Sequence, residues 1–172
     1  LARNNNQKIH IGRIFEICVE KRSEFPLGHP ERKYKGRCVF QGNRVTDENY
    51  MDAIFQNDGS APVTMQAAKV CDFYGLLKGN KIMQCDADQA YTQSKLGGDI
   101  PTWCEIPDER WPKDGSFERH GFIKGVHKAI CPMDLSLYGH LDAGTDWEKH
   151  CDAHLQTVGF KPIKNWLSAY WS

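Results

Sequence analysis

The chain has 172 residues, with 22 Lys and Arg against 22 Asp and Glu, 40% hydrophobic residues and 26% charged residues. These values are typical of a folded domain and exclude a collagen-like repeat, a coiled coil and a disordered polar chain. A chain of this length buries about 70% of its unfolded surface, so its core needs no disulfide or metal. No run of residues approaches the roughly 20 apolar positions that span a bilayer, and the seven cysteines form no CxxC pair, which favours reduced thiols.

The charge is distributed unevenly along the chain. Residues 1–50 contain ten Lys and Arg against six Asp and Glu, whereas residues 81–120 contain five against eight. Such imbalances usually mark a solvated surface, but a local basic strand can contact phosphates even when the whole chain is neutral. Four cations fall within six positions: Arg32, Lys33, Lys35 and Arg37.

Two strand-like segments lie near the start of the chain. Residues 13–20 alternate apolar and polar side chains, and residues 34–42 are again strand-like after a break rich in Pro and Gly. We therefore predict an antiparallel pair with a long connection. Residues 64–77 carry apolar side chains at helical spacing, with Thr64 as the N-cap, and predict a helix.

The second half of the chain continues the mixture of strands and helices. Residues 81–91 read as a short strand that runs into acidic residues, and residues 101–107 as another strand. The run Trp-Pro-Lys-Asp-Gly at 111–115 predicts a turn. Residues 143–158 form an amphipathic pattern closed by Gly159, which predicts a second long helix. The order of elements predicts an α+β fold without repeats.

Two small groups of residues have the composition of metal sites. If residues 82–87 form a strand, Asp86 and Asp88 point to the same face, and paired carboxylates suit Mg²⁺. A solvent-facing acidic turn is the alternative. His150, Cys151 and His154 would lie on one helix, but a tetrahedral zinc site needs further convergent ligands.

The order of five sequence blocks resembles the reverse transcriptase of copia-type retrotransposons. The blocks are RIFEICVEK, RKYKGRCVFQGNRV, SAPVTMQAAKVCDFYG, KIMQCDADQAYTQSKLGGDIPTWCEIP and LSLYGHLDAGTDWEKHCDAHLQTVGF. The resemblance spans about residues 13–160. It implies a right-hand polymerase arrangement in a single partial domain, with residues 13–80 as fingers and residues 81–172 as part of the palm.

The resemblance also assigns roles to individual residues. Asp86 matches the first metal-binding aspartate, which would hold Mg²⁺ or Mn²⁺ for nucleotidyl transfer. The expected nucleotide-binding residues are Lys35 and Arg37 on the finger strand, Ala87 beside the triphosphate, Tyr91 against the sugar, and Tyr138 with Gly139 beneath the template–nucleotide pair. The implied partners are an RNA or DNA template–primer and deoxynucleoside triphosphates, with integrase and RNase H in the same polyprotein. The implied location is a cytoplasmic virus-like particle or the nucleus.

The chain departs from the family pattern in two respects. The block that carries a Val-Asp-Asp hairpin in the family has no counterpart before Ser172, so we expect the chain to be a piece of the polymerase that is inactive by itself. Residues 131–135 and the run HLDAGTDW lack cations that the family carries there, which predicts weaker template binding. The alternative is a catalytically dead derivative that binds nucleic acid or protein.

Overall fold

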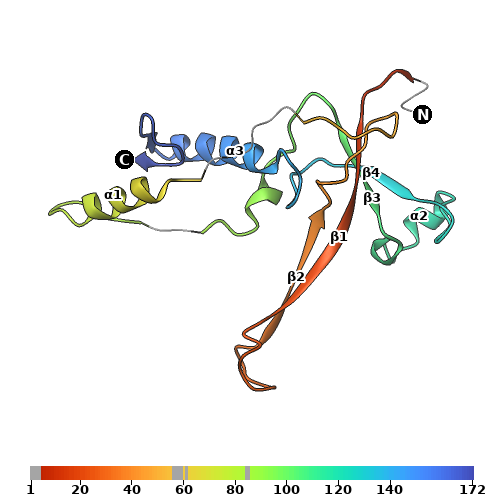
Figure 1. Ribbon diagram of the computed structural model, residues 1–172, viewed down its shortest axis with the longest axis horizontal. Helices are drawn as coiled ribbons and strands as arrows, with labels where there is room; N and C mark the ends of the chain where they lie inside the picture. Colours follow the sequence, from red (N-terminus) through yellow and green to blue (C-terminus); the bar gives the residue numbers. More distant parts are fainter. Residues whose placement is uncertain (1–4, 56–59, 61, 84–85) are drawn as a thin grey trace.

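A four-stranded mixed sheet forms the centre of the protein, as seen in a computed structural model that describes residues 5–55, 60, 62–83 and 86–172 (Figure 1). The strands are β1 (His10–Lys21), β2 (Lys33–Phe40), β3 (Thr102–Ile106) and β4 (Ala129–Pro132), in the order β2-β1-β3-β4. The strand β1 pairs antiparallel with β2 and parallel with β3, and β3 pairs antiparallel with β4. The α+β class, the antiparallel pair and the strand at 101–107 are confirmed.

The two long predicted helices are also confirmed. Helix α1 (Met65–Gly75) begins where the Thr64 side chain accepts a hydrogen bond from the Ala67 N–H. Helix α3 (Ala143–Thr157) is followed by Gly159, which has a φ of 97°. The remaining elements are short: α2 (Ser116–Arg119), the 3-10 turns η2 (Ala90–Gln93) and η3 (Asp108–Arg110), and the strand pair β5 (Lys161–Pro162) with β6 (Tyr170–Trp171).

The strand predicted over residues 81–91 is wrong for the residues that the structure describes. Residues 81–83 and 86–89 are irregular, and Gln84 and Cys85 lie outside the described residues. The side chain of Ile82 packs so closely on Gly75 that a Cβ at that glycine would lie 1.9 Å from Ile82 Cγ1. This contact places Ile82 against the end of α1.

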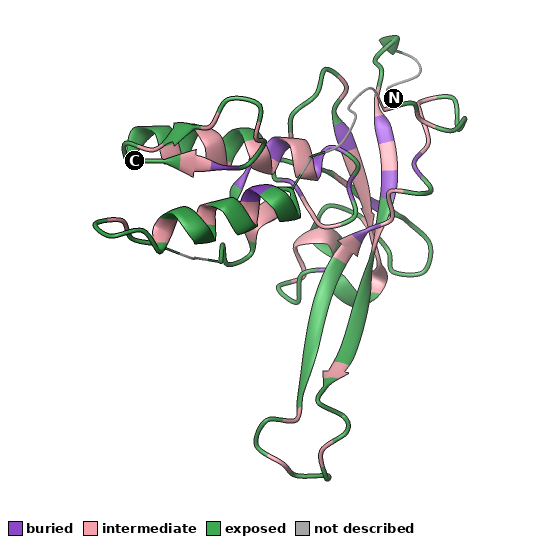
Figure 2. Ribbon diagram, turned by 60° about the vertical axis from the view of Figure 1, so that its left-hand side comes forward, coloured by how far each residue is buried: buried purple, intermediate pink, exposed green. Residues whose placement is uncertain are grey.

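The outer parts of β1 and β2 project from the sheet as an arm, defined here as residues 15–21 and 33–39. Only the first residues of β1 pair with β3, so the arm is a two-stranded ribbon. Figure 2 shows it extending away from the helices with mostly exposed residues. A two-stranded hairpin is only marginally stable in isolation, so the arm depends on the structure at its base.

The base of the arm, which we call the root, is the centre of packing. The ring of Phe40 is 1% exposed and lies against Gly12, whose absent Cβ would fall 2.2 Å from Phe40 Cζ. The rings of Phe40 and His140 have centroids 5.0 Å apart, and His140 Nε2 lies 3.1 Å from Thr102 Oγ1. The root therefore joins β1, β2, β3 and the segment before α3. Within the described residues, no helix is both long and apolar enough to cross a membrane.

Candidate functional site

One face of the arm is cationic and contains no carboxylate. Side chains alternate between the two faces of a strand, so the cross-strand register places partners on the same face. Arg37 is opposite Ile17, Lys35 opposite Val19, and Lys33 opposite Lys21. None of these four cations makes an ion pair with a described residue. Neighbouring cations on one strand are about 7 Å apart at this spacing, so they form a continuous charged row.

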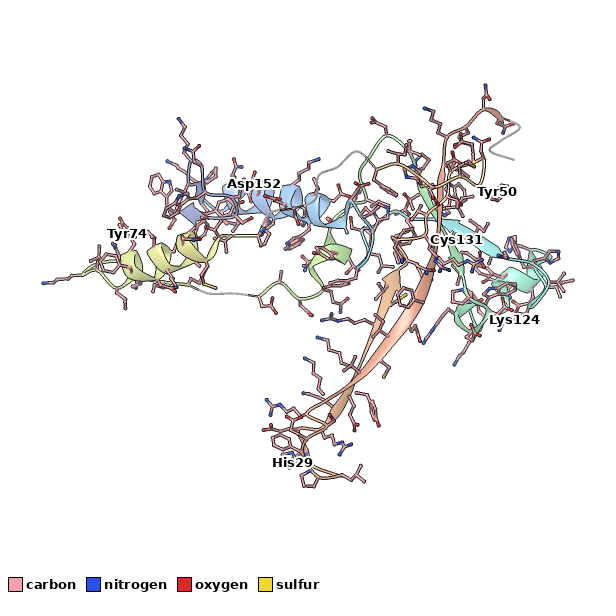
Figure 3. The ribbon with its side chains drawn as sticks, viewed as in Figure 1. His29, Tyr50, Tyr74, Lys124, Cys131 and Asp152 are labelled. Carbon is pink, nitrogen blue, oxygen red and sulfur yellow. The ribbon has the colours of Figure 1, made fainter. Side chains whose placement is uncertain are left out.

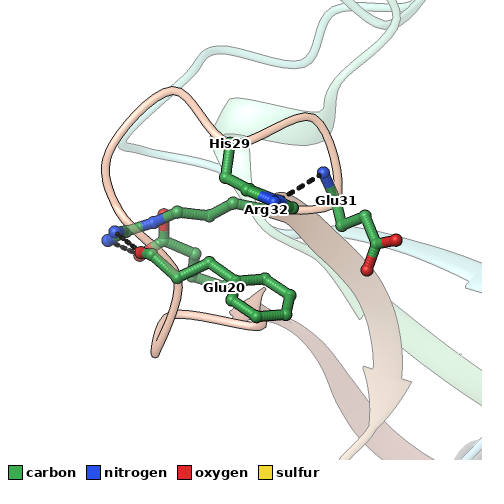
Figure 4. A network of polar contacts seen from close by, with 5 residues as sticks. Glu20, His29, Glu31 and Arg32 are labelled. Atoms are coloured by element: carbon green, nitrogen blue, oxygen red, sulfur yellow. Dashed lines mark hydrogen bonds and ion pairs between the residues drawn. The ribbon is translucent and has the colours of Figure 1, made fainter.

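The carboxylates of β1 lie on the opposite face and are already paired. Glu16 forms an ion pair with Arg110, and Glu20 accepts two hydrogen bonds from the Arg32 guanidinium, at 2.5 and 2.9 Å. Hydrogen bonding by Arg32 lowers the pKa of the Glu20 carboxyl. Arg32 also donates to the Phe25 carbonyl at 2.8 Å, which holds the tip of the arm together (Figure 4). Of the basic cluster noted in the sequence, Arg32 is therefore structural, and Lys33, Lys35 and Arg37 make no ion pair with a described residue.

An aromatic pair lies at the inner end of the cationic face. The rings of Tyr91 and Tyr138 have centroids 4.7 Å apart and are tilted by 53°. The guanidinium carbon of Arg37 lies 5.6 Å from the centre of the Tyr138 ring, which is within cation–π range. Both tyrosines remain half-buried, so they present aromatic surface next to the row of cations.

Backbone hydrogen bonds bring these two tyrosines together from distant parts of the chain. Tyr91 lies in η2, and the segments after η2 and before Tyr138 are joined by Leu96 N–H to the Asp134 carbonyl and Ser136 N–H to the Ser94 carbonyl, both at 3.0 Å. The buried carboxylate of Asp146 on α3 accepts from Gly97 N–H at 2.9 Å and from Ser136 Oγ at 3.3 Å. Helix α3 therefore fixes the position of the aromatic pair.

Two glycines allow the segment that carries Tyr138 to cross the end of β2. Gly139 has a φ of 90°, and a Cβ there would lie 2.1 Å from the Phe40 carbonyl oxygen. A Cβ at Gly42 would lie 2.1 Å from the Gly139 carbonyl oxygen. The Phe40 N–H donates to the Tyr138 carbonyl at 2.7 Å. This close contact between backbones requires glycine at both positions and places Tyr138 over the arm.

The buried His140 anchors the segment that carries Tyr138 to strand β3. The Asp142 N–H donates to His140 Nδ1 at 3.1 Å, so the neutral ring carries its proton on Nε2 and donates to Thr102 Oγ1. Burial lowers the pKa of His140, and burial also lowers the pKa of the nearby His10. Both rings act as uncharged packing groups at neutral pH.

The structure brings together five of the seven site residues predicted from the sequence: Lys35, Arg37, Tyr91, Tyr138 and Gly139. Asp86 and Ala87 precede η2 in an exposed, irregular segment, and Asp86 makes no hydrogen bond or ion pair with any described residue. Lys21 on the cationic face and Gly42 at the crossing were not singled out. Continuing the alternation of residues 13–20 by one position would have placed Lys21 on the face of Ile17 and Val19. The crossing at Gly42 is a long-range contact that leaves no local pattern.

The described residues do not complete a metal site. They contain no group of three or more His, Cys, Asp or Glu side chains arranged to hold a metal ion. Asp86 offers one exposed carboxylate, and His150, Cys151 and His154 of α3 are not joined by the further ligands that tetrahedral zinc requires. The organised part of the site is therefore its cationic and aromatic surface. No protein-family model, curated protein or solved structure matches the chain.

Proposed function

We propose that this chain is part of a copia-type reverse transcriptase, an RNA-directed DNA polymerase, and that the cationic face and the tyrosine pair bind its template–primer and nucleotide. Residues 13–80 would be the fingers and residues 81–172 part of the palm. The observation that carries the proposal is the contact of Arg37 with Tyr138, beside Tyr91. These three residues come from three of the sequence blocks that resemble the family.

The chemistry of this surface suits nucleic acid. Unpaired Lys and Arg side chains neutralise phosphates and release counterions, which supplies most sequence-independent affinity. Aromatic rings beside such a row stack on bases or sugars, at about 1–3 kcal/mol per base. The apolar side chains of Ile17 and Val19 between the cations are 40% and 54% exposed, so the face also offers contacts to the sugars.

Binding of a fluorescent RNA–DNA hybrid, measured by anisotropy over a series of salt concentrations, tests the proposal. Replacing Lys33, Lys35 and Arg37 with Gln should weaken binding about tenfold or more and reduce the salt slope by about 2 to 3. The matched control replaces Lys69, Lys78 and Lys113, three exposed cations away from the arm, with Gln. Equal losses in the two triple variants would mean that only net charge matters, and would contradict the proposal.

The polymerase part of the proposal needs a separate test. Primer extension with deoxynucleoside triphosphates and Mg²⁺ or Mn²⁺ measures nucleotidyl transfer, and Asp86→Asn should abolish any extension while leaving hybrid binding intact. Tyr91→Val should relax discrimination against ribonucleotides if Tyr91 contacts the sugar. Extension that survives Asp86→Asn would remove this residue from the catalytic site.

The alternative function is a reverse-transcriptase-derived module that binds nucleic acid without catalysis. The same unpaired cationic face favours it, because this surface is complete within the described residues. Hybrid binding that depends on the arm, together with no primer extension under any metal condition, would select this alternative.

A further inference from the structure

Two cysteines face each other directly across the outer pair of strands. In the register of β3 and β4, Cys104 is opposite Cys131. Both are half-buried free thiols on β3 and β4, which lie on the opposite side of β1 from β2. Cys131 is labelled in Figure 3. Neither residue takes part in the proposed binding surface.

The register places this pair within reach of a covalent bond. Directly opposite residues in antiparallel strands have Cβ atoms about 4.5–5.5 Å apart. A disulfide joins Cβ atoms about 3.5–4.5 Å apart, with Cα separations of about 4.4–6.8 Å. A shift of about 1 Å between two strands is therefore enough to close the bond. The strand β4 has four residues and lies at the edge of the sheet, so it pairs with β3 alone among the described strands.

The register of the described strands places no other cysteine opposite a second cysteine. Cys18 is opposite Gly36 and Cys38 is opposite Glu16, so no register pair joins them. Cys71 lies on α1 and Cys151 on α3, separate from the sheet. Cys104 and Cys131 are thus the one cross-strand cysteine pair among the residues that the structure describes.

We propose that Cys104 and Cys131 are a reversible disulfide site, oxidised by a low-molecular-weight disulfide of the glutathione type. The bond would tether β4 to β3, and β4 leads within a few residues to the segment that carries Tyr138 and Gly139. A bond formed at the edge of the favourable geometric range is readily reduced, which is a property of regulatory disulfides.

The reaction consumes one glutathione disulfide and releases two molecules of glutathione. One cysteine thiolate attacks a sulfur of glutathione disulfide, the bond between its sulfurs breaks, and glutathione thiolate leaves. The second cysteine thiolate attacks the protein sulfur of the mixed disulfide and releases the second glutathione thiolate. The two protons lost by the cysteines end on the two released thiolates, so the protein is oxidised by two electrons and glutathione disulfide is reduced by two.

The acidity of the thiols predicts how the rate depends on pH. Burial and the neighbouring Cys131 raise the pKa of the Cys104 thiol. Its thiolate fraction is small at neutral pH, and oxidation should become faster as the pH rises.

Peptide mapping of the whole chain after equilibration with reduced and oxidised glutathione tests the site. Trypsin separates the two residues into peptides 96–110 and 129–149, and each peptide contains a single cysteine. After free thiols are blocked, the native protein should give one predominant linked pair that joins these peptides. Oxidation in guanidinium chloride should lower that selectivity about tenfold or more, because unfolding removes the cross-strand register.

Three variants sharpen the result. Cys104→Ser and Cys131→Ser should each abolish the linked pair, whereas Cys71→Ser, which removes a thiol from α1, should leave it unchanged. The experiment on the unmodified chain is decisive even if a variant fails to fold. A different predominant pairing, or free thiols at both cysteines under conditions where other cysteines are oxidised, would overturn the proposal.

Discussion

The root and the arm of the same hairpin differ in burial: the root is tightly packed, whereas the arm is exposed. At the root, Phe40 is 1% exposed, and glycines allow backbones to touch where a Cβ would collide. Along the arm, Phe15, Ile17 and Val19 are 40–54% exposed, and the cations opposite Ile17 and Val19 make no ion pair with a described residue. The root fixes the fold, and the arm holds a surface that is free to bind. Substitutions in the two regions should therefore change different properties.

The largest expected effect is on stability at the root. Phe40→Ala removes the ring that packs on Gly12 and His140, and should lower the free energy of unfolding by about 3–5 kcal/mol. Phe15→Ala is the matched substitution on the arm, where the ring is 43% exposed, and should have a much smaller effect. Urea denaturation of both variants measures the difference, and equal losses would contradict the distinction between root and arm.

Two glycines allow the cost of a left-handed backbone conformation to be measured separately from the cost of a steric collision. Gly139 and Gly28 have φ values of 90° and 89°, but only a Cβ at Gly139 would meet other atoms. Gly28→Ala should lower stability by about 1 kcal/mol, from the left-handed conformation alone. Gly139→Ala should lower it by about 2–3 kcal/mol or more, because strain and a backbone collision add. If the two variants unfold at the same urea concentration, the close contact between the backbones of Gly139 and Phe40 is contradicted.

The aromatic pair should affect binding more than stability. Tyr91→Ala removes the ring beside Tyr138 and should weaken binding of an RNA–DNA hybrid by about 1 kcal/mol or more. Tyr34 lies on the opposite face of the arm and is 73% exposed, so Tyr34→Ala is the matched control and should bind like the unmodified protein. A larger loss in the control would place the interface on the wrong face.

The smallest expected effect is a pH dependence of stability at the root. Because burial lowers the pKa of His10 and His140, the unfolded chain binds protons more tightly than the folded protein. Stability should be fully present above the unfolded pKa of about 6.5 and should fall as the pH drops through the lower, folded pKa values. Urea denaturation at pH 8 and at successively lower pH measures this slope, and His10→Gln combined with His140→Gln should reduce it.

The local elements of the fold were predictable from the sequence because their signals are local. The alternation of residues 13–20 and the strand-like composition of residues 34–42 predicted the hairpin, and Thr64 predicted the start of α1. The parallel pairing of β1 with β3 was not predictable in this way, since periodicity does not identify a partner distant in sequence. The strand β4 was missed because four residues that include Pro132 carry too little pattern.

In the candidate site, too, local features were predictable from the sequence and long-range contacts were not. The family resemblance assigned both Arg37 and Tyr138 to nucleotide binding, but it did not predict their contact, because no property of either residue alone indicates the other. The segment around Asp86 was predicted as a strand from its composition. In the described residues this segment is not a strand, and Ile82 packs on Gly75 instead. Tertiary contacts outweigh local preference where an apolar run is short.

Hydrogen exchange with and without an RNA–DNA hybrid is the most direct test that the cationic face and the tyrosine pair form one binding surface. We expect the hybrid to slow exchange in two segments at once, residues 33–39 of the arm and residues 136–140 around Tyr138, with little change in α1. Protection confined to one of these segments, or centred on α1 or α3, would contradict this expectation.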